Sequence, residues 1–279
     1  MIFIVPVAAA CLYAVGSMGL KKSMQAGTSA RRVMAVSNIA MALWSVPLFF
    51  FFSGTWDLKA WLAAVAAGIA LFAGRICSIK ALEAGDLSIV APLLGMKTIL
   101  VALLSLAFKA EGINLWLLVA AALASAGVAL LQRGPTESMI GMKKAALFAF
   151  AASLLFACTD VLVQSSARVL GVGYFHPTLF LTVAVLIPLL GKHPAPPQEG
   201  KKPLWFGSGI MGFQTSVMIL VIGLSGQATL VNIVYSSRAL WSVVVDRLVG
   251  EPHIKDFMVS RLAGALCITG AVILAILTR

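Results

Sequence analysis

Two basic residues lie in the middle of long apolar runs, where a charged side chain is costly. Arg238 is near the centre of Leu230–Glu251, and Lys97 lies 141 positions earlier, midway along another run. A charge at the centre of a bilayer costs about 2.5–3.5 kcal/mol on insertion scales, so it must face protein, water or a charged ligand. Asp160 and Asp246 fall toward the ends of their runs. Two central cations without a central acid favour an anionic guest. The alternative is that carbonyls or a carboxylate hold each cation as internal packing.

The helical neighbours of Arg238 include side chains that suit a planar solute. Residues three or four positions away share its face, among them Tyr235, Trp241 and Ser242. The two rings would flank a planar group and Ser242 would give a hydrogen bond, with packing against other helices as the equal alternative. The face around Lys97 is apolar, so we expect the second half of the chain to supply more of the specificity.

Four further residues are candidates, each with a plainer alternative. Trp44 and Gln214 lie near the middle of their runs, where they would line a cavity or simply pack and bridge helices. Arg75 would add a second positive charge along the route of the solute. Alternatively, its side chain would extend toward the basic side of the membrane. Asp160 would carry a proton or pair with a base, although its position favours a solvated acid.

The composition predicts an integral membrane protein. Of 279 residues, 61% are hydrophobic and 11% charged, with a mean hydropathy of +1.01, whereas soluble domains are about 45–50% apolar and about 25% charged. The net charge of +11 lies mostly in loops, as membrane orientation requires, so no nucleic-acid partner is expected. The four cysteines match no metal or redox spacing. We expect no cofactor, no metal and no disulfide.

The apolar runs predict ten membrane helices joined by short loops. An open sheet edge cannot be satisfied in lipid, so all must be helices. The start lacks the basic region of a signal peptide, so the first helix is expected to be retained. The seventh run carries Pro177 and Pro188 and is expected to be broken or tilted, and Pro47 and Pro92 read as kinks. The predicted spans are 2–20, 33–53, 60–80, 87–108, 114–132, 145–166, 175–191, 204–224, 228–249 and 261–278.

The two halves of the chain resemble each other. Gly85-Asp86-Leu87-Ser88 pairs with Gly226-Gln227-Ala228-Thr229 at the offset that also relates Lys97 to Arg238. The fold class we predict is therefore all-α, with two five-helix repeats at 1–134 and 135–279. Because five is odd, the second repeat would be inverted in the membrane, as in many carriers.

The basic residues predict an orientation. Thirteen Lys and Arg fall in the odd-numbered loops and four on the opposite face. The positive-inside rule then puts the odd-numbered loops in the cytoplasm and both termini outside.

No catalytic constellation is present in the sequence. Gly207-Ser-Gly-Ile-Met-Gly fits a dinucleotide fingerprint, but it opens a membrane helix without a βαβ context, and its glycines are expected to let helices approach closely. His176, His193 and His253 are expected to stand in separate loops. We expect no enzyme, and a membrane-embedded enzyme or a scaffold is the least favoured function class.

Several short motifs resemble the drug/metabolite transporter superfamily, and within it the ten-helix EamA-type proteins. They are Ala81–Leu93 (ALEAGDLSIVAPL), Gly250-Glu251 after the ninth helix, and Tyr13-Ala-Val-Gly-Ser before Lys21. The resemblance implies two repeats around a central cavity and alternating access. It also implies anion binding by basic residues on helices four and nine, which match Lys97 and Arg238. Small multidrug members use a glutamate in the first helix, which this chain lacks. Bacterial relatives usually have cytoplasmic termini, contrary to the charge count.

These observations predict a secondary transporter of a small anionic or zwitterionic metabolite in the inner membrane. Its partners would be that solute and the lipid bilayer, with homodimerisation left open. The alternative is a proton-coupled exporter of cationic or amphipathic compounds with Asp160 as the coupling acid. The predicted solute-binding residues are Lys97, Arg238, Tyr235, Trp241, Ser242, Gln214, Trp44 and Arg75.

Overall fold

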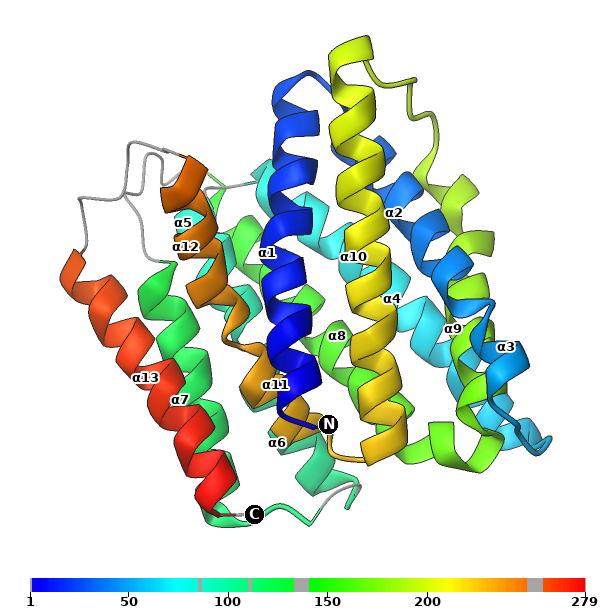
Figure 1. Ribbon diagram of the computed structural model, residues 1–279, viewed down its shortest axis with the longest axis vertical. Coiled ribbons are helices and arrows are strands. Elements are labelled where there is room, and N and C mark those ends of the chain that lie inside the picture. The colour runs from blue at the N-terminus through cyan, green and yellow to red at the C-terminus, as the bar shows by residue number, and fades with distance from the viewer. Residues whose placement is uncertain (1, 85–86, 110–111, 133–140, 250–257, 279) are drawn as a thin grey trace. The chain divides into compact units, whose positions relative to one another are not determined.

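The computed structural model describes residues 2–84, 87–109, 112–132, 141–249 and 258–278, and all regular secondary structure within these ranges is helical (Figure 1). For residues 87–89, 246, 247, 249 and 258 only the backbone is described. The elements are α1 (Ile4–Gln25), α2 (Ala30–Ser45), α3 (Leu48–Phe51), α4 (Leu58–Ala84), α5 (Leu87–Gly95), α6 (Lys97–Ala107), α7 (Leu115–Leu131), α8 (Met142–Leu170), α9 (Val172–Val185), η1 (Ile187–Leu190), α10 (Gln198–Ser225), α11 (Ala228–Tyr235), α12 (Arg238–Val249) and α13 (Met258–Leu277).

Within the described residues, 9 helical stretches are long and apolar enough to cross a membrane. Some of them join two elements, such as α5 with α6 and α11 with α12. The chain therefore fits a multi-pass membrane protein. The predicted span 114–132 corresponds to α7, which is apolar but has only 17 residues. A tenth crossing stays a prediction.

The helices form two compact units, each built from both halves of the chain. The first unit comprises Met1–Phe72 and Leu162–Gly226, and the second comprises Ala73–Val161 and Gln227–Arg279. The units thus cut across the predicted repeats 1–134 and 135–279. A repeat describes a duplication of sequence, whereas a unit describes packing, so the duplication stays a prediction.

Glycines set the contact between α1 and α10 in the first unit. A Cβ atom built on Gly19 would lie 3.0 Å from the Cα atom of Gly207, and one built on Gly207 would lie 2.7 Å from the Leu20 nitrogen. Gly212 meets α2 in the same way, with the Ala40 carbonyl carbon 2.8 Å from its Cβ position. The prediction that this motif serves close helix packing is confirmed at Gly207 and Gly212, whereas a Cβ atom on Gly209 would meet no described atom within 4 Å.

A second close helix pair, α7 with α13, lies in the other unit, and Figure 1 shows these helices side by side. A Cβ atom on Gly127 would lie 2.9 Å from the Gly264 carbonyl oxygen, and one on Gly264 would lie 2.7 Å from that of Gly127. Val128, Leu131 and Ile268 form a buried apolar cluster beside this contact. The backbones approach closely because neither glycine carries a side chain.

Prolines interrupt two of the predicted spans. α2 ends at Ser45, and α3 begins just after Pro47. α9 gives way to the 3-10 helix η1, in which Pro188 is the second residue, whereas Pro177 lies inside α9 without ending it. A proline lacks the N–H that would bond to the carbonyl four residues before it. The expected break in the seventh span is confirmed, and it lies at Pro188.

Candidate functional site

Lys97 is the first residue of α6, directly after a break in its membrane span. Pro92 lies inside α5, and the Met96 N–H donates to the Leu93 carbonyl at 3.1 Å, one residue closer than in an α-helix. A single 3-10 turn therefore separates α5 from α6. Pro92 itself lies inside α5 without ending it, so the kink expected there stays a prediction.

Arg238 occupies the same position in the other broken span. The Ser236 N–H donates to the Ile233 carbonyl and the Ser237 N–H to the Val234 carbonyl, each at 3.2 Å. α12 then begins at Arg238, as α6 begins at Lys97. The breaks thus fall at matching places in the two segments that the sequence aligned.

A cation at the start of a helix is electrostatically unfavourable by itself. The amide dipoles place a partial positive charge at a helix N-terminus, where anions are stabilised and cations are not. Lys97 and Arg238 each add a full positive charge at such an end. Each site is therefore suited to hold a negative group close by.

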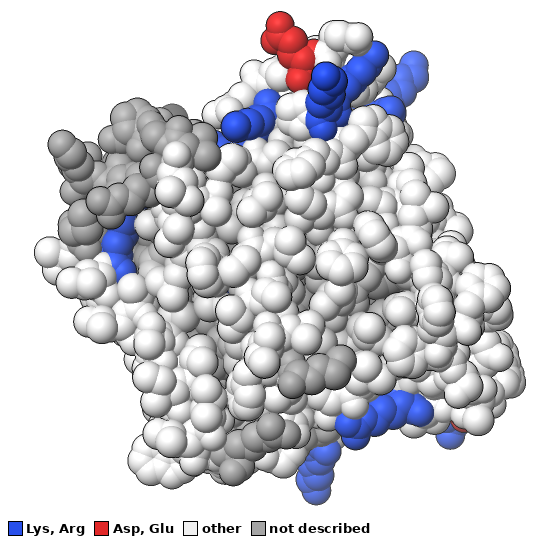
Figure 2. Space-filling view, in the orientation of Figure 1, with Lys and Arg blue, Asp and Glu red and all other residues white. Residues whose placement is uncertain are grey.

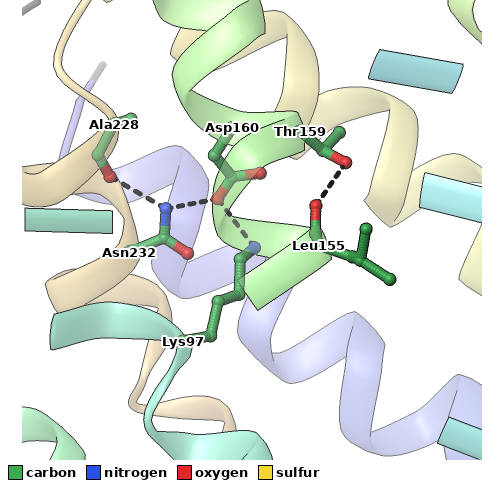
Figure 3. Close-up of polar contacts among 6 residues, drawn as sticks. All are labelled: Lys97, Leu155, Thr159, Asp160, Ala228 and Asn232. Carbon is green, nitrogen blue, oxygen red and sulfur yellow. Dashed lines mark hydrogen bonds and ion pairs between the residues drawn. The ribbon is translucent and has the colours of Figure 1, made fainter. Parts of the chain in front are cut away.

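At Lys97 this negative group is Asp160 of α8. The Lys97 Nζ atom lies 2.7 Å from the Asp160 Oδ2 atom. The Asn232 Nδ2 group of α11 donates to the same oxygen at 2.7 Å and to the Ala228 carbonyl at 2.9 Å (Figure 3). Asp160 is 3% exposed, whereas 20% of the Lys97 side chain is accessible. Three helices of one unit thus meet at a buried carboxylate.

α8 supports the break at a second point. The Ser153 hydroxyl donates to the Leu93 carbonyl at 2.7 Å, which lies in the turn before Lys97. Ser153 is two helical turns before Asp160, so both side chains lie on about the same face of α8. Thr159, by contrast, donates to the Leu155 carbonyl of its own helix (Figure 3). α8 therefore fixes both the break and the charge that follows it.

The expectation of a solvated Asp160 is wrong. The predicted span ended at residue 166, which placed Asp160 near its end, but α8 continues to Leu170 and the side chain is buried. The argument from two central cations without a central acid therefore fails at Lys97, which pairs with Asp160. The alternative in which a carboxylate holds Lys97 describes the observed contact.

Tyr235 lies against Arg238, as their spacing predicted. The Arg238 guanidinium carbon is 5.0 Å from the centre of the Tyr235 ring, a cation–π distance, and Tyr235 is buried. The Ser242 hydroxyl donates to the Arg238 carbonyl at 2.9 Å, which is a contact within its own helix. Trp241 is 36% exposed.

The remaining predicted residues are distributed over both units. Trp44 and Gln214 belong to the first unit, where the Trp44 Nε1–H donates to the Gly209 carbonyl at 3.1 Å. The buried Gln214 donates to the Thr215 hydroxyl at 2.7 Å. Arg75 is half-buried on the part of α4 that belongs to the second unit, with Lys97 and Arg238. The roles of these three residues in solute binding stay predictions.

Sequence reasoning missed Asn232, which joins Lys97 and Asp160 in one network. Its signal was present, because an amide within a membrane span needs a hydrogen-bond partner. Asn38 of α2 was missed as well. It is 0% exposed, and neither polar atom of its amide has a hydrogen-bond partner within the described residues. Across those same residues, no group of three His, Cys, Asp or Glu side chains is placed to hold a metal ion.

Comparisons with known proteins establish the fold. A solved structure described as "Crystal structure of protein" has a TM-score of 0.79 to this chain at 14% sequence identity, and the match covers 99% of this chain and 96% of the other. In all, 28 chains of solved structures match. No protein-family model and no curated protein matches the sequence. The fold is therefore shared with solved structures over nearly the whole chain.

Proposed function

We propose that this chain is a secondary transporter of a small zwitterionic or anionic metabolite. The observation that carries the proposal is the Lys97–Asp160 ion pair at a helix break inside membrane-spanning helices. Ionisable groups at such depth are expensive, and they mark solute and ion pathways in carriers. Broken helices whose ends point at a charged solute are typical of carrier binding sites.

The ion pair favours a zwitterion over a simple anion. A solute carboxylate can replace Asp160 on Lys97 while the solute ammonium replaces Lys97 on Asp160, so that no buried charge is left alone. A simple anion that binds Lys97 would leave the Asp160 carboxylate without its cation, which costs several kcal/mol in a buried site. Arg238 and Tyr235 add a cation and an aromatic ring to the same unit.

We further propose that the chain is an EamA-type member of the drug/metabolite transporter superfamily and works by alternating access. The matching positions of Lys97 and Arg238 support an inverted duplication, with both cations at the start of a second helical segment. The basic loops support an orientation with both termini outside the cytoplasm. A reporter fused to Arg279 that is active only in the cytoplasm would contradict this orientation.

The test begins with metabolites measured inside and outside cells that do or do not express the protein. Uptake of the compound whose concentration changes is then measured in proteoliposomes. The competitors are its own charge variants: the free amino acid, the N-acetylated anion and the methyl-ester cation. The proposal predicts that the zwitterion competes best and the cation worst. Proteoliposomes that transport none of the compounds would contradict the function itself.

The burial of Asp160 also favours a second function, proton-coupled export of cationic or amphipathic compounds. In that case Asp160 would carry the proton, and Lys97 would compete with the cationic solute for the carboxylate. Asp160→Asn should then abolish drug resistance, while Arg238→Ala should leave it unchanged. The zwitterion proposal predicts that both variants lose transport.

A further inference from the structure

We propose that the adjoining ends of α1 and α10 form a binding surface for anionic phospholipid headgroups. Figure 2 shows Lys and Arg side chains gathered over the end of the first unit where α1 stops and α10 begins, with acidic atoms beside them. Four lysines define this surface, which we call the basic surface: Lys21, Lys22, Lys201 and Lys202.

The two helix ends are fixed against each other. α1 and α10 run antiparallel, with Gly19 against Gly207. The Ser23 hydroxyl oxygen lies within hydrogen-bond distance of the Gly200 carbonyl, at 3.0 Å, and of the Thr28 hydroxyl, at 2.9 Å. Ser23 directly follows the first lysine pair and Gly200 directly precedes the second. The backbone beneath the basic surface is therefore held in place before any lipid binds.

Exposed aromatic side chains lie one helical turn below the second lysine pair. Trp205 is 60% exposed and Phe206 is 57% exposed, and they follow Lys201 and Lys202 by four residues. Positions i and i+4 share a helix face. Aromatic rings beneath a row of lysines are typical of the level where headgroups meet acyl chains. The lysines then stand at the height of the lipid phosphates.

Charge and depth together select an anionic lipid as the occupant. Four lysines at adjoining helix ends repel one another, and Glu199 is the acidic residue beside them in the α10 sequence. A phosphodiester offsets this repulsion, while its acyl chains cover the exposed rings. A free phosphate ion would meet the lysines but would leave Trp205 and Phe206 bare.

Native mass spectrometry of the full chain in detergent tests the proposal, with phosphatidylglycerol and phosphatidylcholine of identical acyl chains as probes. We expect wild type to prefer phosphatidylglycerol. Each lysine near an anionic surface is worth about fivefold in affinity, so Lys201→Gln/Lys202→Gln should weaken phosphatidylglycerol binding about 30-fold without changing phosphatidylcholine binding. The matched control is Lys59→Gln/Lys109→Gln, which removes two exposed lysines outside the basic surface and should change neither.

Three outcomes would overturn the proposal. They are equal binding of the two lipids by wild type, an equal loss in the control variant, or displacement of phosphatidylglycerol by equimolar inorganic phosphate, which would indicate a free-anion site. The variant Trp205→Ala separates the contribution of the aromatic ring from that of the lysine charges. It should weaken both lipids while keeping the preference for phosphatidylglycerol, because the ring contacts acyl chains rather than phosphate. All of these readouts are independent of transport.

Discussion

Lys97 and Asp160 form an ion pair with 2.7 Å between the Nζ and Oδ2 atoms, and the two residues belong to different helices of one unit. The lysine begins α6, where the helix dipole disfavours a cation, and the carboxylate is almost fully buried. Each group therefore compensates for the other. A solute that separates them must supply both charges, which connects the geometry of the pair to the proposed zwitterionic substrate.

Removing only the lysine should destabilise the protein strongly. Lys97→Met leaves the buried Asp160 carboxylate without its cation, and removal of one partner of a buried pair costs about 3–5 kcal/mol. Because Lys97 is partly exposed, we expect the loss in free energy of unfolding to lie near the lower end of this range. The midpoint of thermal unfolding in detergent measures it.

The double variant Lys97→Met/Asp160→Leu is the matched control for this loss. With both charges replaced by apolar groups, most of the lost stability should return. A double variant that is destabilised by the sum of the two single changes would show that the residues do not interact.

Asn232→Leu should cost less stability than Lys97→Met. The amide donates one hydrogen bond to a charged group and one to the Ala228 carbonyl, and a hydrogen bond to a charged group is worth about 1.5–3 kcal/mol. Because Asn232 orients Asp160, the variant should also lower solute affinity in proteoliposome uptake. Asn232→Asp should be worse than Asn232→Leu, since it places a second carboxylate beside the first. Wild-type affinity in both variants would contradict a positioning role.

The contact between Arg238 and Tyr235 depends on the ring rather than on the hydroxyl group. Tyr235→Phe keeps the ring under the guanidinium, while Tyr235→Leu removes a cation–π contact worth about 0.5–2 kcal/mol. We therefore expect Tyr235→Phe to retain uptake and Tyr235→Leu to raise the KM. If Tyr235→Phe lost as much as Tyr235→Leu, the phenol hydroxyl would be the important group.

The α7–α13 contact predicts a steep dependence on side-chain size at Gly264. A Cβ atom there would lie 2.7 Å from the Gly127 carbonyl oxygen and 2.8 Å from the Leu131 nitrogen, so Gly264→Ala must force the helices apart. Overpacking of this kind costs about 1–3 kcal/mol. The matched control on the same helix is Gly270→Ala, whose Cβ position is 3.5 Å from the Leu123 Cδ2 atom, an ordinary contact. Equal unfolding midpoints for the two variants would refute the close approach.

Much of the architecture could be predicted from the sequence because the bilayer imposes it. Length and hydropathy determine where membrane helices lie, and nine of the expected spans match described helical stretches. The cost of a buried charge singled out Lys97 and Arg238, and their spacing placed Tyr235 beside Arg238. Close helix packing at Gly207 and Gly212 was predicted correctly, because the motif opens an apolar run.

The partner of Lys97 could not be predicted in the same way. Hydropathy marks a helix end only where apolar residues stop, and the predicted span stopped at residue 166, whereas α8 continues to Leu170. Asp160 therefore seemed solvated. Its contact with Asn232 and Lys97 joins three helices that are far apart in sequence, and no local pattern encodes such a meeting.

Solute uptake by proteoliposomes containing Lys97→Met/Asp160→Leu tests the central claim most directly. This variant should remain folded because no buried charge is left unpaired, so a loss of uptake cannot be attributed to unfolding. The account predicts that the variant loses uptake of the metabolite identified in cells while its unfolding midpoint stays close to that of wild type. Uptake at the wild-type rate would contradict the claim that the ion pair forms the solute-binding site.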